Sequence, residues 1–196
     1  MNYLAHIFLS GNDRRVEIGN FIGDAVKGHS YELYPEAIRQ GILLHRAIDG
    51  FTDNHMLVRK TVQDLKPYFG RYSAIVLDIF FDYMLASRFS DFSDMSLGKF
   101  SRRFYLALIT NRRHLPHRIK RFMWHFIATD RLSRYADKEG IRRSLEIMVA
   151  YKHISISPLQ AIEYLDEHEE HLRSIFNEFF KELQTYVNEL CLTAGH

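Results

Sequence analysis

Two pairs of polar residues lie four positions apart in segments that are otherwise apolar. His45 and Asp49 form one pair, and Asp78 and Asp82 form the other. Residues four apart share one face of a helix. A buried carboxylate costs several kcal/mol unless it is paired, protonated or bound to a cation. The two pairs therefore predict a metal site inside a helical bundle, with the four side chains meeting at one point.

Four further residues are candidates for the same site. His6 and Asp24 each interrupt an apolar segment, Asp53 follows Asp49 by four positions, and Arg46 adjoins His45. Each has a simpler explanation. A lone buried histidine such as His6 is more often a hydrogen-bonded core residue than a ligand. Asp24 could cap a turn, and Asp53 could belong to the turn that ends a helix.

An ion-pair network is the alternative to a metal site. His45 could pair only with Asp49, and arginines could neutralise the two aspartates of the second pair. These segments hold few cations for so many carboxylates, which favours the metal. Nitrogen and oxygen ligands without sulfur suit Mn²⁺, Mg²⁺ or Fe²⁺ more than a structural Zn²⁺. Such a metal activates water and neutralises a phosphoryl oxygen, so phosphoester hydrolysis is the expected chemistry. The sequence has neither a glycine-rich phosphate loop nor a G-x-S-x-G motif.

Helices must position these residues, because helical spacing covers almost the whole chain and alternating strand patterns are absent. No linker divides the chain, so residues 1–196 are expected to form a single all-α domain, a multi-helix bundle. The expected helices cover residues 2–9, 16–27, 35–52, 56–68, 72–88, 97–110, 118–128, 138–152 and 158–190.

Composition and charge limit the classes of protein to which the chain can belong. The chain has 196 residues, 46% of them hydrophobic, a single cysteine and a formal net charge of +2. No apolar segment approaches the roughly 20 residues needed to cross a bilayer, so a cytoplasmic protein without membrane contact is expected. Basic residues gather in one stretch that contains no acid and favours an acidic partner, although a solvated face would look the same. This basic stretch comprises Arg102, Arg103, Arg112, Arg113, Arg118, Lys120 and Arg121.

Four motifs resemble the acyl carrier protein phosphodiesterase family, in that family's order. They are Met1-Asn2-Tyr3-Leu4-Ala5-His6, Gly19-Asn20-Phe21-Ile22-Gly23-Asp24, the segment from His45 to Asp53, and Leu77-Asp78-x-x-x-Asp82. The family hydrolyses the phosphodiester that joins 4′-phosphopantetheine to a serine of acyl carrier protein. It is similar to the HD-domain metallohydrolases, which are all-helical and typically Mn²⁺-dependent.

The resemblance implies a role for each candidate residue. The metal ligands would be His45, Asp49, Asp78 and Asp82, joined by His6 and Asp53. Asp24 would act at the same site, and Arg46 or Lys27 would bind the phosphoryl oxygens. The basic stretch would attract the acidic carrier protein, which disfavours nucleic acid as the partner. Two alternatives stay open: a metal-dependent hydrolase of nucleotides or other small phosphodiesters, and a non-catalytic helical adaptor for acidic partners.

We expect Asp82→Ala to abolish hydrolysis without unfolding the protein. The change removes a predicted ligand, and it also relieves repulsion among neighbouring carboxylates. Activity assays, metal analysis and thermal unfolding of the variant check this. Full activity with an intact metal content would contradict the ligand role.

Overall fold

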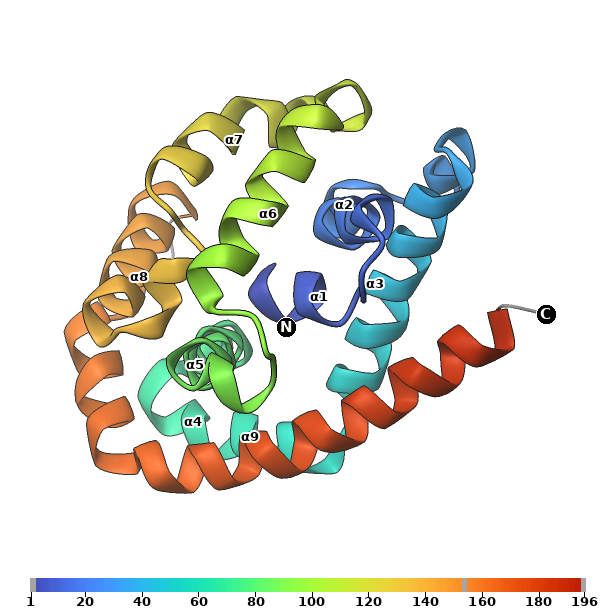
Figure 1. Ribbon diagram of the computed structural model, residues 1–196. Coiled ribbons are helices and arrows are strands. Elements are labelled where there is room, and N and C mark those ends of the chain that lie inside the picture. Colours follow the sequence, from blue (N-terminus) through green and yellow to red (C-terminus); the bar gives the residue numbers. More distant parts are fainter. Residues whose placement is uncertain (1–2, 153–154, 195–196) are drawn as a thin grey trace. The chain divides into compact units, whose positions relative to one another are not determined.

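The computed structural model describes residues 3–152 and 155–194 of the chain, and within these residues all regular structure is helical (Figure 1). The all-α prediction is therefore confirmed. The α-helices are α1 (Tyr3–Phe8), α2 (Arg14–Ile22), α3 (Glu36–Asn54), α4 (Met56–Phe69), α5 (Ser73–Ser87), α6 (Leu97–Thr110), α7 (His117–Ala128), α8 (Lys138–Lys152) and α9 (Pro158–Ala194). Most bounds agree with the sequence prediction to within two residues. Asn2, the expected start of the first helix, lies outside the described residues.

The second helix departs from its prediction at its C-terminal end. It starts where Asp13 caps it, because the Asp13 carboxylate accepts hydrogen bonds from the backbone of Arg15 and Val16 at 2.7 and 3.3 Å. It was expected to continue to Lys27 but ends at Ile22, and a 3-10 turn, Gly23–Ala25, follows. The expected end was wrong because hydrophobic spacing does not reveal where a helix changes to a tighter turn.

The chain divides into two compact units. The first unit comprises Tyr3–Gly50 and Phe89–Ser133, and the second comprises Phe51–Arg88 and the described part of Arg134–His196. Helix α3 therefore contributes its last residues to the second unit. The single-domain organisation stays a prediction. None of the helices in the described part of the chain is long and apolar enough to cross a membrane.

Two glycines bring α2 and α3 together in the first unit. A Cβ atom built at Gly19 would lie 2.8 Å from the Cα of Gly41 and 2.0 Å from the carbonyl oxygen of Ile38. No side chain fits there, so the two backbones touch directly. This close crossing fixes the position of Asn20, on α2, relative to His45, on α3.

Aromatic rings join four helices of the first unit. The ring of Phe21 on α2 lies 4.9 Å from Tyr3 on α1, 5.1 Å from Phe104 on α6 and 5.4 Å from Phe126 on α7, between centroids. Phe21 and Phe104 are almost fully buried. Such contacts hold the short helix α1, which carries His6, against the longer helices around it.

A buried ion pair also connects α2 to α6. Glu17 is fully buried, and the guanidinium of Arg103 pairs with its carboxylate. Burial raises the pKa of Glu17 to about 6, although Arg103 opposes the shift. The pair is therefore part of the fold, and Arg103 differs in this respect from the exposed members of the basic stretch.

A polar cluster organises the second unit, in which α5 packs against α4 and α9. Glu169 on α9 accepts hydrogen bonds from Tyr83 on α5 at 3.0 Å and from Arg173 at 2.9 Å, and it pairs with Lys138 on α8 at 2.6 Å. Burial would raise the pKa of Glu169, but its cationic partners and Tyr83 lower it to about 2. The cluster fixes α5, which carries Asp78 and Asp82, against α8 and α9.

We expect the Glu17 carboxyl to make the protein less stable as pH rises from 4.5 to 7. Its folded-state pKa of about 6 lies above its ordinary value of 4.5, so the folded protein holds a proton that the unfolded chain has released. Relative to Glu17→Gln, the free energy of unfolding of the wild type should fall by about 1.5 kcal/mol across this range. Urea unfolding of both proteins at several pH values measures the difference. A difference that does not change with pH would contradict the raised pKa.

Candidate metal site

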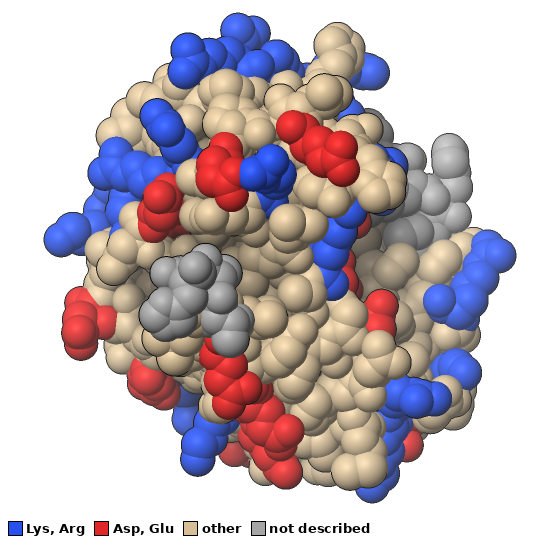
Figure 2. Space-filling model, turned by 90° about the vertical axis from the view of Figure 1, so that its right-hand side faces the viewer, with Lys and Arg blue, Asp and Glu red and all other residues tan. Residues whose placement is uncertain are grey.

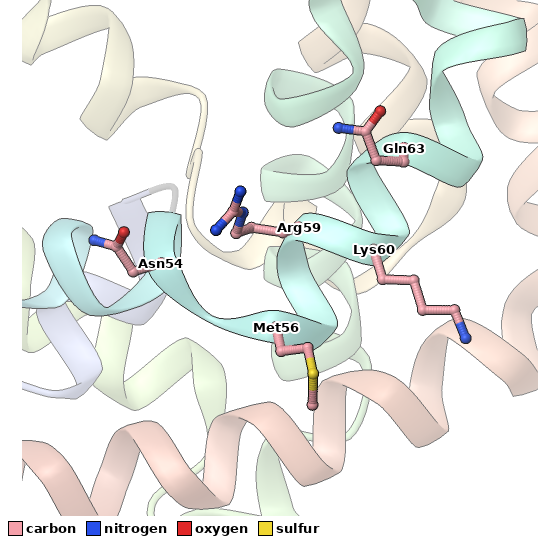
Figure 3. A pocket seen from close by; sticks show the side chains of 5 residues that line it. All are labelled: Asn54, Met56, Arg59, Lys60 and Gln63. Atoms are coloured by element: carbon pink, nitrogen blue, oxygen red, sulfur yellow. The ribbon is translucent and has the colours of Figure 1, made fainter.

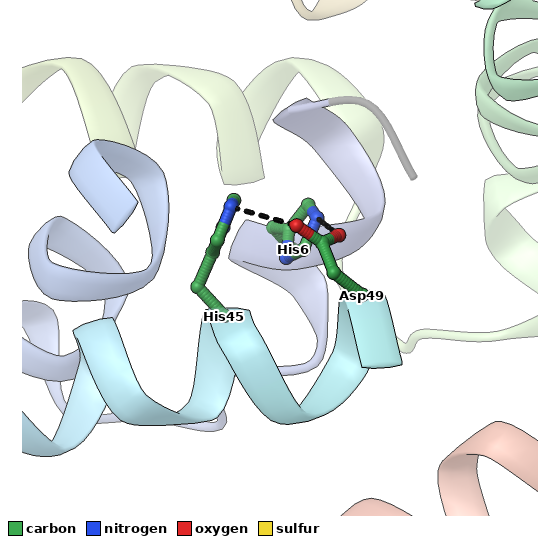
Figure 4. A group of neighbouring side chains, drawn as sticks. All are labelled: His6, His45 and Asp49. Atoms are coloured by element: carbon green, nitrogen blue, oxygen red, sulfur yellow. Dashed lines mark ion pairs between the residues drawn. The ribbon is translucent and has the colours of Figure 1, made fainter. Parts of the chain in front are cut away.

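Three side chains of the first unit converge on one point (Figure 4). They are His6 from α1 and His45 and Asp49 from α3, and each offers one ligand atom within 4.8 Å of the others. The two carboxylate oxygens of Asp49 divide between the imidazoles. Oδ1 lies 3.2 Å from Nε2 of His6, and Oδ2 lies 3.1 Å from Nε2 of His45. His45 and Asp49 therefore lie next to each other on α3, as their spacing predicts, and His6 joins them.

The backbone leaves room for this arrangement at Gly23. A Cβ atom on Gly23 would lie 2.3 Å from Cγ of His45, so a larger residue would displace the imidazole. The rings of His45 and His6 stack, with centroids 4.1 Å apart and planes inclined by 23°. His45 is therefore held between Gly23 on one side and His6 on another, and its orientation is largely fixed.

The imidazole nitrogens lack well-directed hydrogen bonds. Among the described residues, Nε2 of His6 and both ring nitrogens of His45 are buried and have no hydrogen-bond partner of good geometry, although Asp49 is close to both rings. Buried polar atoms normally have such a partner. A cation bound between Nε2 of His6, Nε2 of His45 and the carboxylate would satisfy these three groups together, and this is the structural observation that favours a metal.

Burial and close approach shift the pKa values of His6, His45 and Asp49. Burial lowers the pKa of His6 to about 4, so its imidazole is neutral at pH 7. Burial alone would also lower the pKa of His45, but Asp24 and Asp49 raise it to about 9. In turn, the two histidines hold the pKa of Asp49 well below its usual range, against the effect of burial. In the metal-free chain the protonated imidazole of His45 supplies the positive charge that a divalent cation would otherwise supply.

Asp24 lies at the solvent side of this group. Its Oδ1 is 3.8 Å from Nε2 of His45, and its side chain is 81% exposed, against 37% for Asp49 and 9% for His45. The His45 imidazole lowers the pKa of Asp24. The site therefore combines two buried imidazoles with one partly exposed carboxylate, Asp49, and one largely exposed carboxylate, Asp24. The donor atoms fit a divalent metal.

The remaining predicted residues of the first unit lie near the loop after α2. Arg46 donates hydrogen bonds to the carbonyl oxygens of Val26 at 3.1 Å and Gly28 at 2.7 Å, and its guanidinium lies over the ring of Tyr31. Lys27, in the same loop, is exposed. Arg46 therefore holds the loop in place, while Lys27 is available to a ligand.

The other predicted ligands lie in the second unit. Asp53 is exposed near the end of α3, Asp78 is half-buried on α5, and Asp82 on the same helix is fully buried. The structure brings His6, His45, Asp49 and Asp24 together. The participation of Asp53, Asp78 and Asp82 stays a prediction.

The basic stretch lies on α6, α7 and the turn between them. Arg102, Arg112, Arg113, Arg118 and Arg121 are exposed, whereas Lys120 is half-buried and Arg103 pairs with Glu17. Figure 2 shows one face of the molecule, on which basic and acidic side chains are interspersed. The five exposed arginines are the members that an acidic partner could contact.

A surface hollow of about 350 Å³ lies at the start of α4 in the second unit (Figure 3). It is lined by Asn54, Met56, Arg59, Lys60 and Gln63. The lining has no carboxylate, imidazole or thiol, so the hollow does not supply metal ligands. Its lining residues therefore differ in type from those of the candidate metal site.

Sequence reasoning missed Asn20 as a site residue. Asn20 is fully buried on α2, and its Oδ1 lies 2.8 Å from Nδ1 of His6. The signal was present, because Asn20 is a lone polar residue between Ile18-Gly19 and Phe21-Ile22. A buried amide in such a segment needs polar partners.

Comparisons with known proteins give one consistent result. A family model described as acyl carrier protein phosphodiesterase matches residues 1–183. The chain is similar to curated proteins of that name: 30% identical to one from Enterobacter sp. (strain 638) over 92% of this chain and 94% of the relative, and 28% identical to one from Klebsiella pneumoniae over 93% and 95%. A third, from Escherichia coli O139:H28, is 27% identical over 98% and 100%. No solved structure matches the chain.

We expect Asp49→Asn to weaken binding of Mn²⁺ by at least about tenfold, because the carboxylate contacts both imidazoles and supplies the ligand charge. Calorimetric titration of the metal-free protein measures this. Asp64→Asn, which removes an exposed carboxylate from α4, is the matched control and should bind like the wild type. Asp53→Asn tests the remaining predicted ligand on α3. Unchanged affinity in Asp49→Asn would exclude the site.

Proposed function

The chain belongs to the acyl carrier protein phosphodiesterase family, and we propose that it hydrolyses the phosphodiester joining 4′-phosphopantetheine to a serine of acyl carrier protein. The products would be apo carrier protein and 4′-phosphopantetheine. The observation that carries this proposal is the group of His6, His45 and Asp49, whose buried nitrogens and carboxylate suit a divalent cation.

The metal we propose is Mn²⁺. Two imidazole nitrogens disfavour Mg²⁺, which prefers oxygen ligands and keeps several waters, while Fe²⁺ remains compatible with the donor set. A divalent cation bound there supplies Lewis-acid polarisation of a phosphoryl oxygen and makes a bound water more acidic. An HD-domain-like arrangement of this helical site, and a cytoplasmic location, are part of the same proposal.

The chain's own residues supply orientation and proton transfer. His6 and His45 would hold the cation through their buried nitrogens, and Asp49, whose oxygens lie 3.2 and 3.1 Å from those nitrogens, would supply the carboxylate ligand. Asp24, which is exposed and 3.8 Å from His45, would accept a proton from the attacking water or join the ligands. Lys27 is exposed in the loop that Arg46 holds, and its ammonium would bind a phosphoryl oxygen as charge develops there.

The direct test is incubation of holo carrier protein with the enzyme and Mn²⁺, followed by mass spectrometry. We expect the carrier protein to lose its phosphopantetheine group, and His45→Gln to leave the carrier protein intact. In water labelled with ¹⁸O, the label should enter the phosphate of the released 4′-phosphopantetheine, since attack is at phosphorus. An unchanged carrier protein beside rapid hydrolysis of nucleotide diesters would favour the alternative small-substrate enzyme instead.

The exposed arginines give the second test of this proposal. We expect the double variant Arg112→Glu and Arg121→Glu to lower kcat/KM for the acidic carrier protein by about tenfold or more at low salt. The loss should shrink at 1 M salt, where the Debye length is about 3 Å. Hydrolysis of bis(p-nitrophenyl) phosphate should hardly change, because a small diester does not need the docking surface.

Lys66→Glu with Lys181→Glu is the matched control for that variant. Both lysines are exposed outside the basic stretch, and the change in net charge is the same. Equal losses in the two double variants would mean that total charge, rather than the basic stretch, attracts the substrate. Equal losses on both substrates, independent of salt, would mean that the stretch supports the fold.

A further inference from the structure

A closed network of hydrogen bonds surrounds the backbone of His6. The side chain of Asn20 donates from Nδ2 to the carbonyl oxygen of His6 at 2.8 Å and to Oγ of Ser10 at 2.9 Å. The hydroxyl of Ser10 donates to the same carbonyl oxygen at 2.8 Å. All three residues are buried, with Asn20 fully so. Both amide hydrogens of Asn20 are thus used within this network.

The network fixes which way the Asn20 amide points. A carbonyl oxygen can only accept hydrogen bonds, so the NH₂ group must face the carbonyl of His6. The amide oxygen Oδ1 must then face the imidazole of His6, whose Nδ1 lies 2.8 Å away. Turning the amide over would place Oδ1 against the carbonyl oxygen at the same short distance, with two acceptors in contact.

The amide in turn fixes the tautomer of the imidazole. Oδ1 of Asn20 accepts, so Nδ1 of His6 must carry the proton at this distance. A neutral imidazole has one proton, so Nε2 keeps its lone pair. That nitrogen lies 3.2 Å from Oδ1 of Asp49 and has no well-directed hydrogen bond within the described residues. Two acceptors therefore face each other there, and a cation bound between them would satisfy both.

We propose that Asn20 is a positioning residue of the metal site: by accepting from Nδ1 of His6 it keeps the Nε2 lone pair directed at the cation. The proposal rests on the metal site described under the proposed function, and it assigns a role to a residue that does not touch the metal. Asn20 acts through His6, as partners behind a ligating histidine do in metal sites generally. The backbone carbonyl of His6 is the origin of the orientation.

The tautomer can be read directly in the metal-free protein. Long-range ¹H–¹⁵N correlation spectra distinguish protonated from unprotonated imidazole nitrogens, and the His6→Gln variant assigns the signals of His6 among the 11 histidines. We expect the wild type at pH 7 to carry the His6 proton on Nδ1 alone. A proton on Nε2 alone would overturn the proposal, whatever the variants do.

Variants of Asn20 test the consequence for the metal. Asn20→Leu keeps the size of the side chain but cannot accept from Nδ1, so the proton should redistribute between the two nitrogens. The dissociation constant for Mn²⁺ should rise by about 10–100-fold. Asn20→Asp retains an oxygen that accepts from Nδ1, so it should retain the tautomer and most of the affinity. Its second oxygen would face the carbonyl oxygen of His6, so its thermal unfolding temperature should fall.

Ser10→Ala is the matched control for loss of packing. It removes another member of the same network and should lower the thermal unfolding temperature, but it leaves Oδ1 of Asn20 facing His6, so tautomer and metal affinity should stay unchanged. A loss of affinity in Ser10→Ala equal to that in Asn20→Leu would overturn the positioning role. Neither readout uses the substrate, so a failure to hydrolyse holo carrier protein would count against the proposed function and not against Asn20.

Discussion

The Asp49 carboxylate contacts two stacked imidazoles, and its charge must be balanced in a partly buried place. Its two oxygens lie 3.1 and 3.2 Å from the ring nitrogens of His45 and His6. The two rings respond differently, because burial lowers the pKa of His6 to about 4 while the carboxylates raise that of His45 to about 9. In the metal-free chain one imidazolium balances the charge. A divalent cation can replace that proton, provided that the surrounding backbone keeps both rings in place.

The surrounding backbone meets this requirement by close approach rather than by large side chains. Gly19 and Gly41 let α2 and α3 touch, and Gly23 leaves the space that the His45 ring fills. The same helix α2 presents Asn20 to His6 and Glu17 to Arg103. Helix α2 therefore provides, within three turns, the contact surface for α3, a hydrogen bond to one ligand and the ion pair to α6. A side chain at Gly19 would force α2 and α3 apart and would move Asn20 relative to His45.

The helices could be predicted from the sequence because hydrophobic spacing and capping residues are local signals, and α6 and α8 begin and end where expected. The end of α2 could not, because hydrophobic spacing does not reveal where an α-helix passes into a 3-10 turn. His45 and Asp49 were found from their spacing, which places them on one helix face. His6 was the weaker candidate, since only the fold brings it to Asp49. Asn20 stood out as a lone polar residue, but only the fold shows that its partners are the imidazole and the carbonyl of His6, 14 positions away.

The number of carboxylates at the site determines how many cations it can hold. One divalent cation with neutral His6 and His45 and the anion Asp49 leaves a net charge of +1, which attracts a phosphodiester monoanion. Adding Asp24 brings the charge to zero. If Asp78 and Asp82 also ligate, as the sequence predicts, a single cation would leave a net charge of −2 that repels the substrate. A second cation would then be required. Ligation by the two α5 aspartates therefore predicts two cations per site.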